Sequence, residues 1–134
     1  MLLLLLACTG KDAGAESVPR PLFAITQPLS GATVGRCFTA VAETNGVELV
    51  DPTDHPDNVD GQGHWHILLD QRYFVCETEA CEVRIEDIEP GPFTLVGRLV
   101  QNDYTDWLDE DGAIVEDHVD LVITDGGCGT DTTR

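Results

Sequence analysis

The stretch GQGHWHILLD (Gly61–Asp70) alternates between two kinds of side chain. In an extended strand, successive side chains point to opposite faces of the sheet. One face would carry an apolar set, Trp65, Ile67 and Leu69, and the other would carry His64 and His66. A strand with one such apolar face needs a second layer to cover it, so this stretch predicts a layered β-structure rather than an isolated sheet.

Similar short runs recur along the chain, about ten residues apart and separated by Pro-, Gly- and Asn-rich turns. They are Leu22–Thr26, Arg36–Glu43, Val47–Val50, Arg72–Cys76, Cys81–Ile88, Gly91–Gln101 and His118–Thr124. No segment shows a sustained helical period. The pattern predicts an all-β fold, an antiparallel immunoglobulin-like β-sandwich of about seven to eight strands stapled by disulfides, with a small barrel as the alternative.

Period two also predicts which residues of the later strands face the core. Phe93, Leu95 and Leu99 would point inward from one strand, and Val119, Leu121 and Ile123 would point inward from the last. Two long segments, Asp51–Gly63 and Asn102–Asp117, are rich in Asp and read as loops. Exported sandwiches often carry their function on such loops.

The N-terminus reads MLLLLLACTG, which is too short an apolar run to span a bilayer. Leu5–Cys8 resembles a bacterial lipobox, in which the cysteine is lipidated. The resemblance implies a signal segment over residues 1–7, a lipidated N-terminus and flexible tether over 8–20, and a sandwich domain over 21–130. We therefore expect a protein of the bacterial cell envelope, anchored by lipid at the outer membrane or on the periplasmic side.

Four cysteines remain once Cys8 is assigned to lipid: Cys37, Cys76, Cys81 and Cys128. In a small exported domain they predict two disulfides, for which three connectivities exist. Cys76 and Cys81 flank ETEA between two alternating segments, so we expect a bridge that closes a hairpin. That leaves Cys37 with Cys128. A thiolate metal site is the competing interpretation, but the CxxC spacing typical of such sites is absent.

The formal net charge is −18, with only seven Lys and Arg residues. This charge excludes nucleic acid as a partner, because phosphate neutralisation requires basic side chains. Attachment to an anionic membrane would have to come from the lipid rather than from charge. An acidic surface keeps a domain soluble, and it also attracts cations.

His64 and His66 would lie side by side, with Cα atoms about 6.6 Å apart in an extended strand. Two neighbouring imidazoles can bind one copper, zinc or nickel ion. A stronger site needs a further ligand, for which the candidates are His118, His55 and the loop carboxylates. The alternative interpretation is a pair of exposed histidines that bind nothing.

Most of the segment Ile25–Val122 is similar to a group of bacterial exported lipoprotein domains of uncharacterised function. The shared elements are the Pro-x-x-Gly-x-x-Val opening at 28–34, the Gly-His-x-His strand at 63–66, and a late Pro-Gly strand that runs into Asn102-Asp103. Tyr104 stands where that family usually has a third histidine. The resemblance therefore implies a metal site at His64 and His66, with Tyr104, Asp103 or His118 in place of the third ligand.

The leading hypothesis is a non-catalytic module that binds copper or zinc through the His-x-His strand. The second is a surface interaction domain whose acidic loops bind a protein or a glycan. The third is a redox enzyme of the superoxide dismutase type, for which four histidines are too few. Nucleophilic catalysis has no support, because the only serines are Ser17 in the tether and Ser30 in a turn. We therefore expect no enzyme activity.

Overall fold

The computed structural model describes residues 21–128, and these form nine β-strands and no α-helix. The strands are β1 (Leu22–Gln27), β2 (Ala32–Val34), β3 (Cys37–Asn45), β4 (Glu48–Leu49), β5 (Gln62–Leu69), β6 (Arg72–Cys76), β7 (Ala80–Arg84), β8 (Gly91–Val100) and β9 (Glu116–Ile123). The predicted signal segment, the Cys8 lipid site and the tether lie outside the described residues. Within the described part, no helix is long and apolar enough to cross a membrane.

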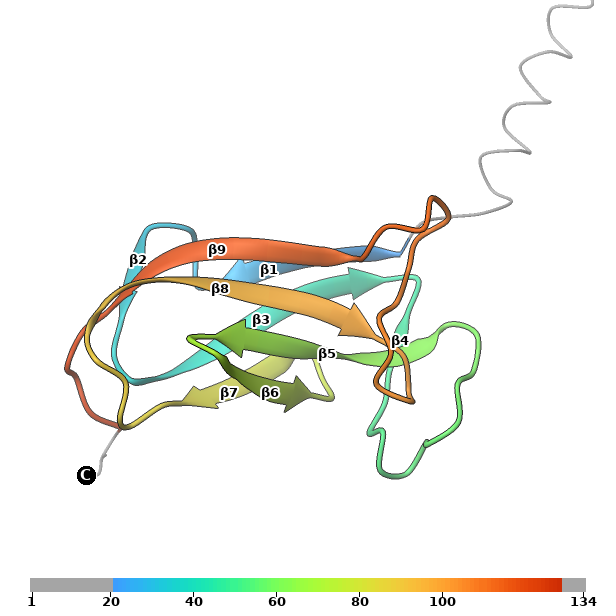
Figure 1. The fold of residues 1–134 in the computed structure, drawn as a ribbon, viewed down its shortest axis with the longest axis horizontal. Helices are drawn as coiled ribbons and strands as arrows, with labels where there is room; N and C mark the ends of the chain where they lie inside the picture. Colours follow the sequence, from blue (N-terminus) through green and yellow to red (C-terminus); the bar gives the residue numbers. More distant parts are fainter. Residues whose placement is uncertain (1–20, 129–134) are drawn as a thin grey trace, which may run out of the picture.

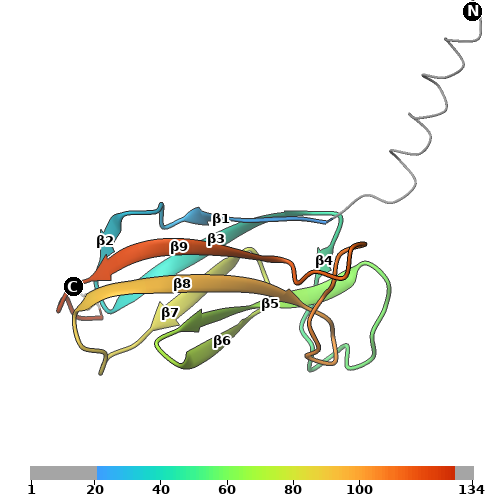
Figure 2. The same cartoon turned by 45° about the horizontal axis from the view of Figure 1, so that its top comes forward.

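The strands form two sheets that pack face to face, which confirms the all-β prediction (Figures 1 and 2). One sheet has the order β1-β3-β7, and the other has the order β2-β9-β8-β5-β4 with β6 also paired to β5. The prediction of purely antiparallel pairing is wrong at two places, because β2 runs parallel to β9 and β4 runs parallel to β5. β2 was also missed as a strand, since its three residues are too few to show alternation.

The alternation in β5 is confirmed by the core between the sheets. Trp65 and Ile67 are fully buried, and Leu69 is almost so. Trp65 contacts Phe23 edge to face at 5.6 Å between ring centroids. Its indole N–H donates to the carbonyl of Thr78 at 2.8 Å, which satisfies the polar end of a buried ring.

The later strands also follow the predicted pattern. Leu95 and Leu99 are fully buried, whereas Phe93 is partly buried against the same core. Val119, Leu121 and Ile123 of β9 are buried as well. The residues that alternate with these inward side chains in β8 and β9 point to the opposite side of the sheet. We define this side, the face of the six-stranded sheet turned away from the three-stranded one, as the outer face.

Both predicted disulfides, Cys76–Cys81 and Cys37–Cys128, are present. The expectation that Cys76–Cys81 closes a hairpin is wrong, because β6 pairs with β5 whereas β7 pairs with β3. The bridge instead links the two sheets where the chain crosses between them. Cys37–Cys128 joins the start of β3 to the segment that follows β9.

The two predicted loops lie at the same end of the molecule, beside the start of β5 (Figures 1 and 2). The first loop comprises residues 50–61, and the second comprises residues 101–115. Asp103 N–H donates to the Asn58 side-chain oxygen at 2.9 Å, which connects the second loop to the first. The His-x-His motif therefore begins where two long connections meet.

Candidate metal centre

β5 and β8 place the two histidines on the outer face. His64 is paired with Val100 and His66 with Arg98 in the antiparallel register of these strands. The apolar members of β5 occupy the inner face, so strand geometry alone directs both imidazoles outward. Their positions follow from the alternation predicted from the sequence.

The two imidazole rings face each other. The Nε2 atoms of His64 and His66 are 3.1 Å apart, and the ring centroids are 4.9 Å apart. His64 is completely buried although it lies on the outer face, whereas His66 is partly exposed. The Nδ1 atom of His64 has no hydrogen-bond partner. A shared contact through one nitrogen of each ring is the defining feature of this pair.

Tyr104 covers the pair from the second loop. Its ring centroid lies 4.9 Å from that of His64 and 5.4 Å from that of His66. Its backbone φ is +74°, a conformation that is unusual for an aromatic residue and that closes a turn back to the carbonyl of Gln101. A residue with this unusual backbone conformation, held over the buried His64, marks the turn as a candidate functional element.

Tyr73 of β6 completes the aromatic surroundings, with its ring 5.2 Å from that of His66. Sequence reasoning missed Tyr73. Tyr73 is paired with Leu68, which is two residues after His66 and lies on the same outer face. The short distance between Tyr73 and His66 therefore depends on the register between β5 and β6. The sequence shows only an alternating strand there.

Burial and nearby charges set the protonation of both rings. Burial, with a smaller contribution from the neighbouring His66, lowers the pKa of His64 from 6.5 to about 4, and the negative charge of Asp51 partly opposes this change. Burial also lowers the pKa of His66, with Asp106 opposing this effect and Arg98 adding to it. Both imidazoles are therefore neutral near pH 7, which is the form that binds metal ions.

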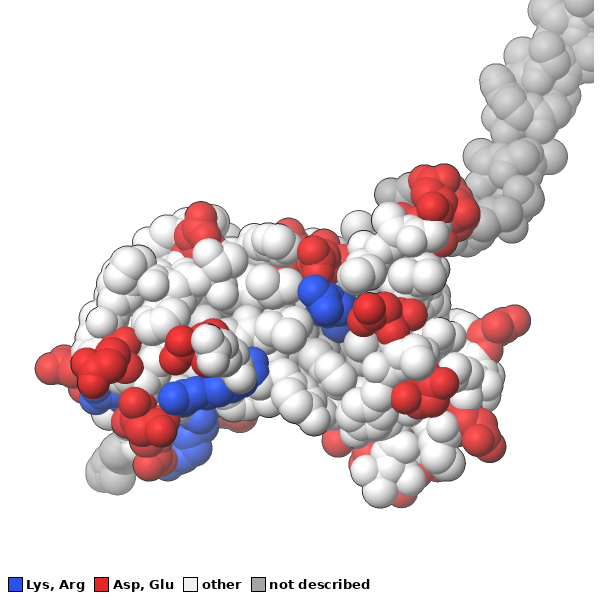
Figure 3. Space-filling view, viewed as in Figure 1, with Lys and Arg blue, Asp and Glu red and all other residues white. Residues whose placement is uncertain are grey.

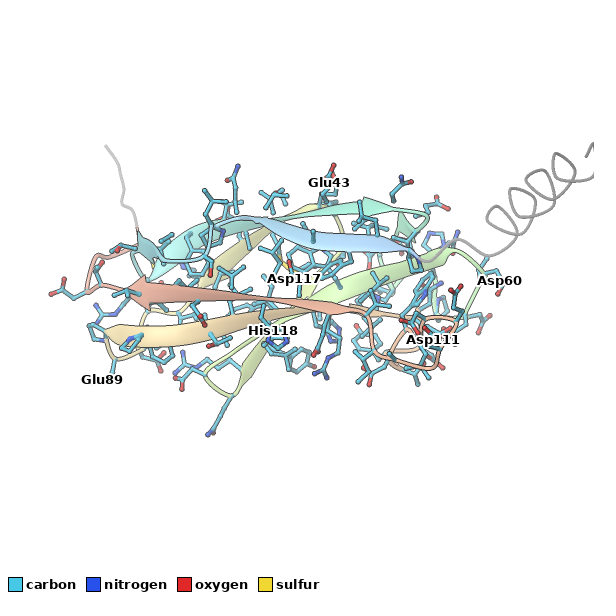
Figure 4. The ribbon with its side chains drawn as sticks, turned by 90° about the horizontal axis from the view of Figure 1, so that it is seen from above. Glu43, Asp60, Glu89, Asp111, Asp117 and His118 are labelled. Atoms are coloured by element: carbon cyan, nitrogen blue, oxygen red, sulfur yellow. A yellow bond between two sulfur atoms is a disulfide. The ribbon has the colours of Figure 1, made fainter. Side chains whose placement is uncertain are left out.

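Of the other predicted ligands, Tyr104 lies beside the pair, His118 lies elsewhere, and the Asp103 carboxylate is engaged within its own loop. His118 is on β9, two strands from β5, and its Nε2 is 3.1 Å from a carboxylate oxygen of Glu116. Figure 4 shows it midway along the sheet, far from Asp60 and Asp111 in the loops. The Asp103 carboxylate accepts a hydrogen bond from the Thr105 N–H at 3.0 Å. Within residues 21–128, no three His, Cys, Asp or Glu side chains are grouped to hold a metal.

Gly63 explains how the second loop packs so closely over β5. A Cβ at this position would collide with the carbonyl oxygen of Val100 and lie 3.0 Å from the ring of Trp107. Trp107 is partly buried against the core, and its backbone N–H donates to the backbone carbonyl of Leu99 at 3.2 Å. The glycine before His64 therefore leaves room for the loop that carries Tyr104.

The surface around these elements is acidic. Asp and Glu side chains are spread across the face shown in Figure 3, whereas Lys and Arg gather at two places. One of the few basic groups near the site is Arg98, which pairs with Glu116 at 3.0 Å. A surface rich in carboxylates attracts cations to this face of the domain.

No protein-family model matches the sequence. No curated protein sequence matches it either. A solved structure of fibronectin(III)-like modules of CbhA from Clostridium thermocellum is similar to the chain, with a TM-score of 0.43 and 13% sequence identity. The match covers 76% of this chain and 95% of that one. At this level the likeness says nothing about function.

Proposed function

We propose that this protein is a non-catalytic metal-binding module that holds one copper or zinc ion between the Nε2 atoms of His64 and His66. The observation that carries the proposal is their 3.1 Å separation. With metal–nitrogen bonds of about 2.0–2.1 Å, nitrogens at this separation subtend an angle of about 100° at a shared ion. Square-planar and tetrahedral sites require about 90° and about 109°, so this separation is compatible with both geometries, with the ion off the line between the two nitrogens.

The surroundings of the pair favour a cation. The lowered pKa values of His64 and His66 keep both imidazoles neutral, so each ring retains one nitrogen lone pair for a metal. Asp51 and Asp106 are close enough to influence these pKa values, so their negative charge also acts on a bound ion. Because no three His, Cys, Asp or Glu side chains within residues 21–128 are grouped to hold a metal, the Tyr104 phenol or water would complete the coordination. Because only two protein ligands are already in place, we expect a moderate affinity and a bound ion that exchanges readily.

We also infer the setting of the domain. Two disulfides are typical of oxidising compartments, which supports export. Together with the lipobox-like Leu5–Cys8, they support a lipid-anchored protein of the bacterial cell envelope. The two packed sheets are consistent with an immunoglobulin-like sandwich that displays its metal site and loops at one end.

Metal titration of the full chain, stripped of metal, tests this function. Cu(II) and Zn(II) are titrated by calorimetry into wild type and into the His64→Gln and His66→Gln variants. His118→Gln is the matched control, because it removes an imidazole from the same outer face but two strands away. We expect one ion per chain, a large loss of affinity in both site variants and no change in the control. Equal affinity in all four proteins would exclude the function.

A second candidate function is a surface interaction domain that binds a protein or a glycan. It is favoured by a pocket between the two loops, lined by Asp60 and Asp106 together with apolar side chains that include Leu108. Leu108 is 53% exposed, which is high for an apolar side chain beside a pocket. A loop variant, Leu108→Ser, that loses a partner while retaining full metal affinity would favour this function.

A further inference from the structure

Two polar side chains share an unusual position in the described part of the chain. His64 and Asn102 are its only buried polar residues, with 0% and 1% of their surface exposed. Each leaves one buried atom without a hydrogen-bond partner, Nδ1 of His64 and Oδ1 of Asn102. An unsatisfied buried polar atom costs about 1–3 kcal/mol, so two such atoms require a physical explanation.

The strand register and one hydrogen bond relate the positions of the two residues. Gln62 precedes His64 by two positions and therefore lies on the same side of β5. Asn102 follows Val100, the cross-strand partner of His64, by two positions. The Nδ2 group of Asn102 donates to Oε1 of Gln62 at 3.3 Å. The amide of Asn102 is thus held beside the residue next to His64 on this face.

A second hydrogen bond fixes the orientation of the amide. Nδ2 of Asn102 also donates to the backbone carbonyl of Asp57 at 2.8 Å. A carbonyl oxygen only accepts, so the group that faces it must be the NH₂. Oδ1 is consequently an acceptor that lacks a donor. His64 offers the complementary group, since an imidazole whose Nε2 keeps its lone pair carries its proton on Nδ1.

We propose that Asn102 is the positioning residue of His64. Its Oδ1 accepts the Nδ1–H of His64 through one bridging water, and so holds the tautomer whose Nε2 lone pair faces His66. In the metal-free protein the Nε2–H of His66 donates to that lone pair. When an ion binds, His66 carries its proton on Nδ1 instead, so that the Nε2 lone pairs of both rings are free to coordinate. The proposal rests on the proposed function and adds the residue that prepares the first ligand.

The tautomer is measured directly by long-range ¹H–¹⁵N correlation spectra of the metal-free full chain. We expect the His64 proton on Nδ1 in wild type and its shift toward Nε2 in Asn102→Ala. Asn102→Asp discriminates between the roles of Asn102, because it keeps an acceptor but loses both Nδ2 hydrogen bonds, as Ala does. A positioning role predicts that Asp retains the Nδ1–H tautomer. A purely structural role predicts that Asp and Ala behave alike.

Metal affinity provides the second measurement. Loss of such a supporting hydrogen bond typically weakens metal binding about 10–100-fold, and we expect this for Asn102→Ala. Asn58→Ala is the matched control, because the Asn58 side chain also joins the two loops but does so by accepting from the backbone N–H of Asp103. We expect it to bind like wild type.

The outcomes separate the two proposals. If wild type binds no metal but Asn102 controls the His64 tautomer, the proposed function fails and the positioning role stands. If wild type binds metal but carries the His64 proton on Nε2, or if Asn102→Asp behaves as Asn102→Ala does, the positioning role is overturned. The wild-type and Asp spectra decide the question even if the Ala variant does not fold.

Discussion

Acidification should destabilise the metal-free domain through one buried imidazole. His64 titrates near 6.5 in the unfolded chain but near 4 in the folded protein, because burial disfavours its cation. Between these pH values the unfolded state binds a proton that the folded state does not, so protonation favours unfolding. The stabilising effect is fully present above pH 6.5 and is lost as the pH falls towards 4.

The size of the effect follows from the two pKa values. Each unit of difference corresponds to about 1.4 kcal/mol, so His64 lowers the free energy of unfolding by about 2 kcal/mol between pH 7.5 and pH 5, and by about 3 kcal/mol at pH 4. The lowered pKa of His66 acts in the same direction. Carboxylates contribute little to the pH dependence of the unfolding free energy above pH 5. The interval from pH 7.5 to pH 5 therefore reports mainly on the histidines.

Urea unfolding at several pH values between 7.5 and 5, with a chelator present, measures this slope. The comparison is between wild type, His64→Gln and His118→Gln, all of which share the same carboxylates. We expect His64→Gln to lose most of the pH dependence and the exposed His118→Gln to retain it, whatever each substitution does to stability at pH 7.5. An identical slope in wild type and His64→Gln would refute the assigned burial of this imidazole.

Two further substitutions test the packing around β5. Gly63→Ala should destabilise the domain by about 2–3 kcal/mol, because the added methyl group meets backbone that cannot move aside. Gly127→Ala, which enters open space, should leave urea unfolding unchanged, and equal midpoints for the two variants would contradict the close approach of the second loop. Trp65→Phe should cost about 1–3 kcal/mol, since it removes the hydrogen bond to Thr78 O and part of a filled core. A loss below about 0.5 kcal/mol in the same assay would show that the indole N–H is not satisfied there.

Several features of this protein could be predicted from local sequence because they depend on local geometry. The inward direction of Trp65 and its alternate neighbours in β5 follows from the two-residue repeat of any extended chain. The pairing of Cys76 with Cys81 follows from a separation of only five residues. The side-by-side placement of His64 and His66 follows from the same repeat.

Other features depend on which segments become neighbours in space. Alternation directs His64 away from the core, but only the path of the second loop buries it under Tyr104. The sheet order separates His118 from the pair, and strand pairing brings Asn102 beside Gln62. Burial then decides the pKa and the unpaired Nδ1 of His64. The direction of a side chain in a strand is set by its neighbours along the chain. The residues that bury it, desolvate it and form hydrogen bonds with it are distant in the sequence. Only folding determines which distant residues these are.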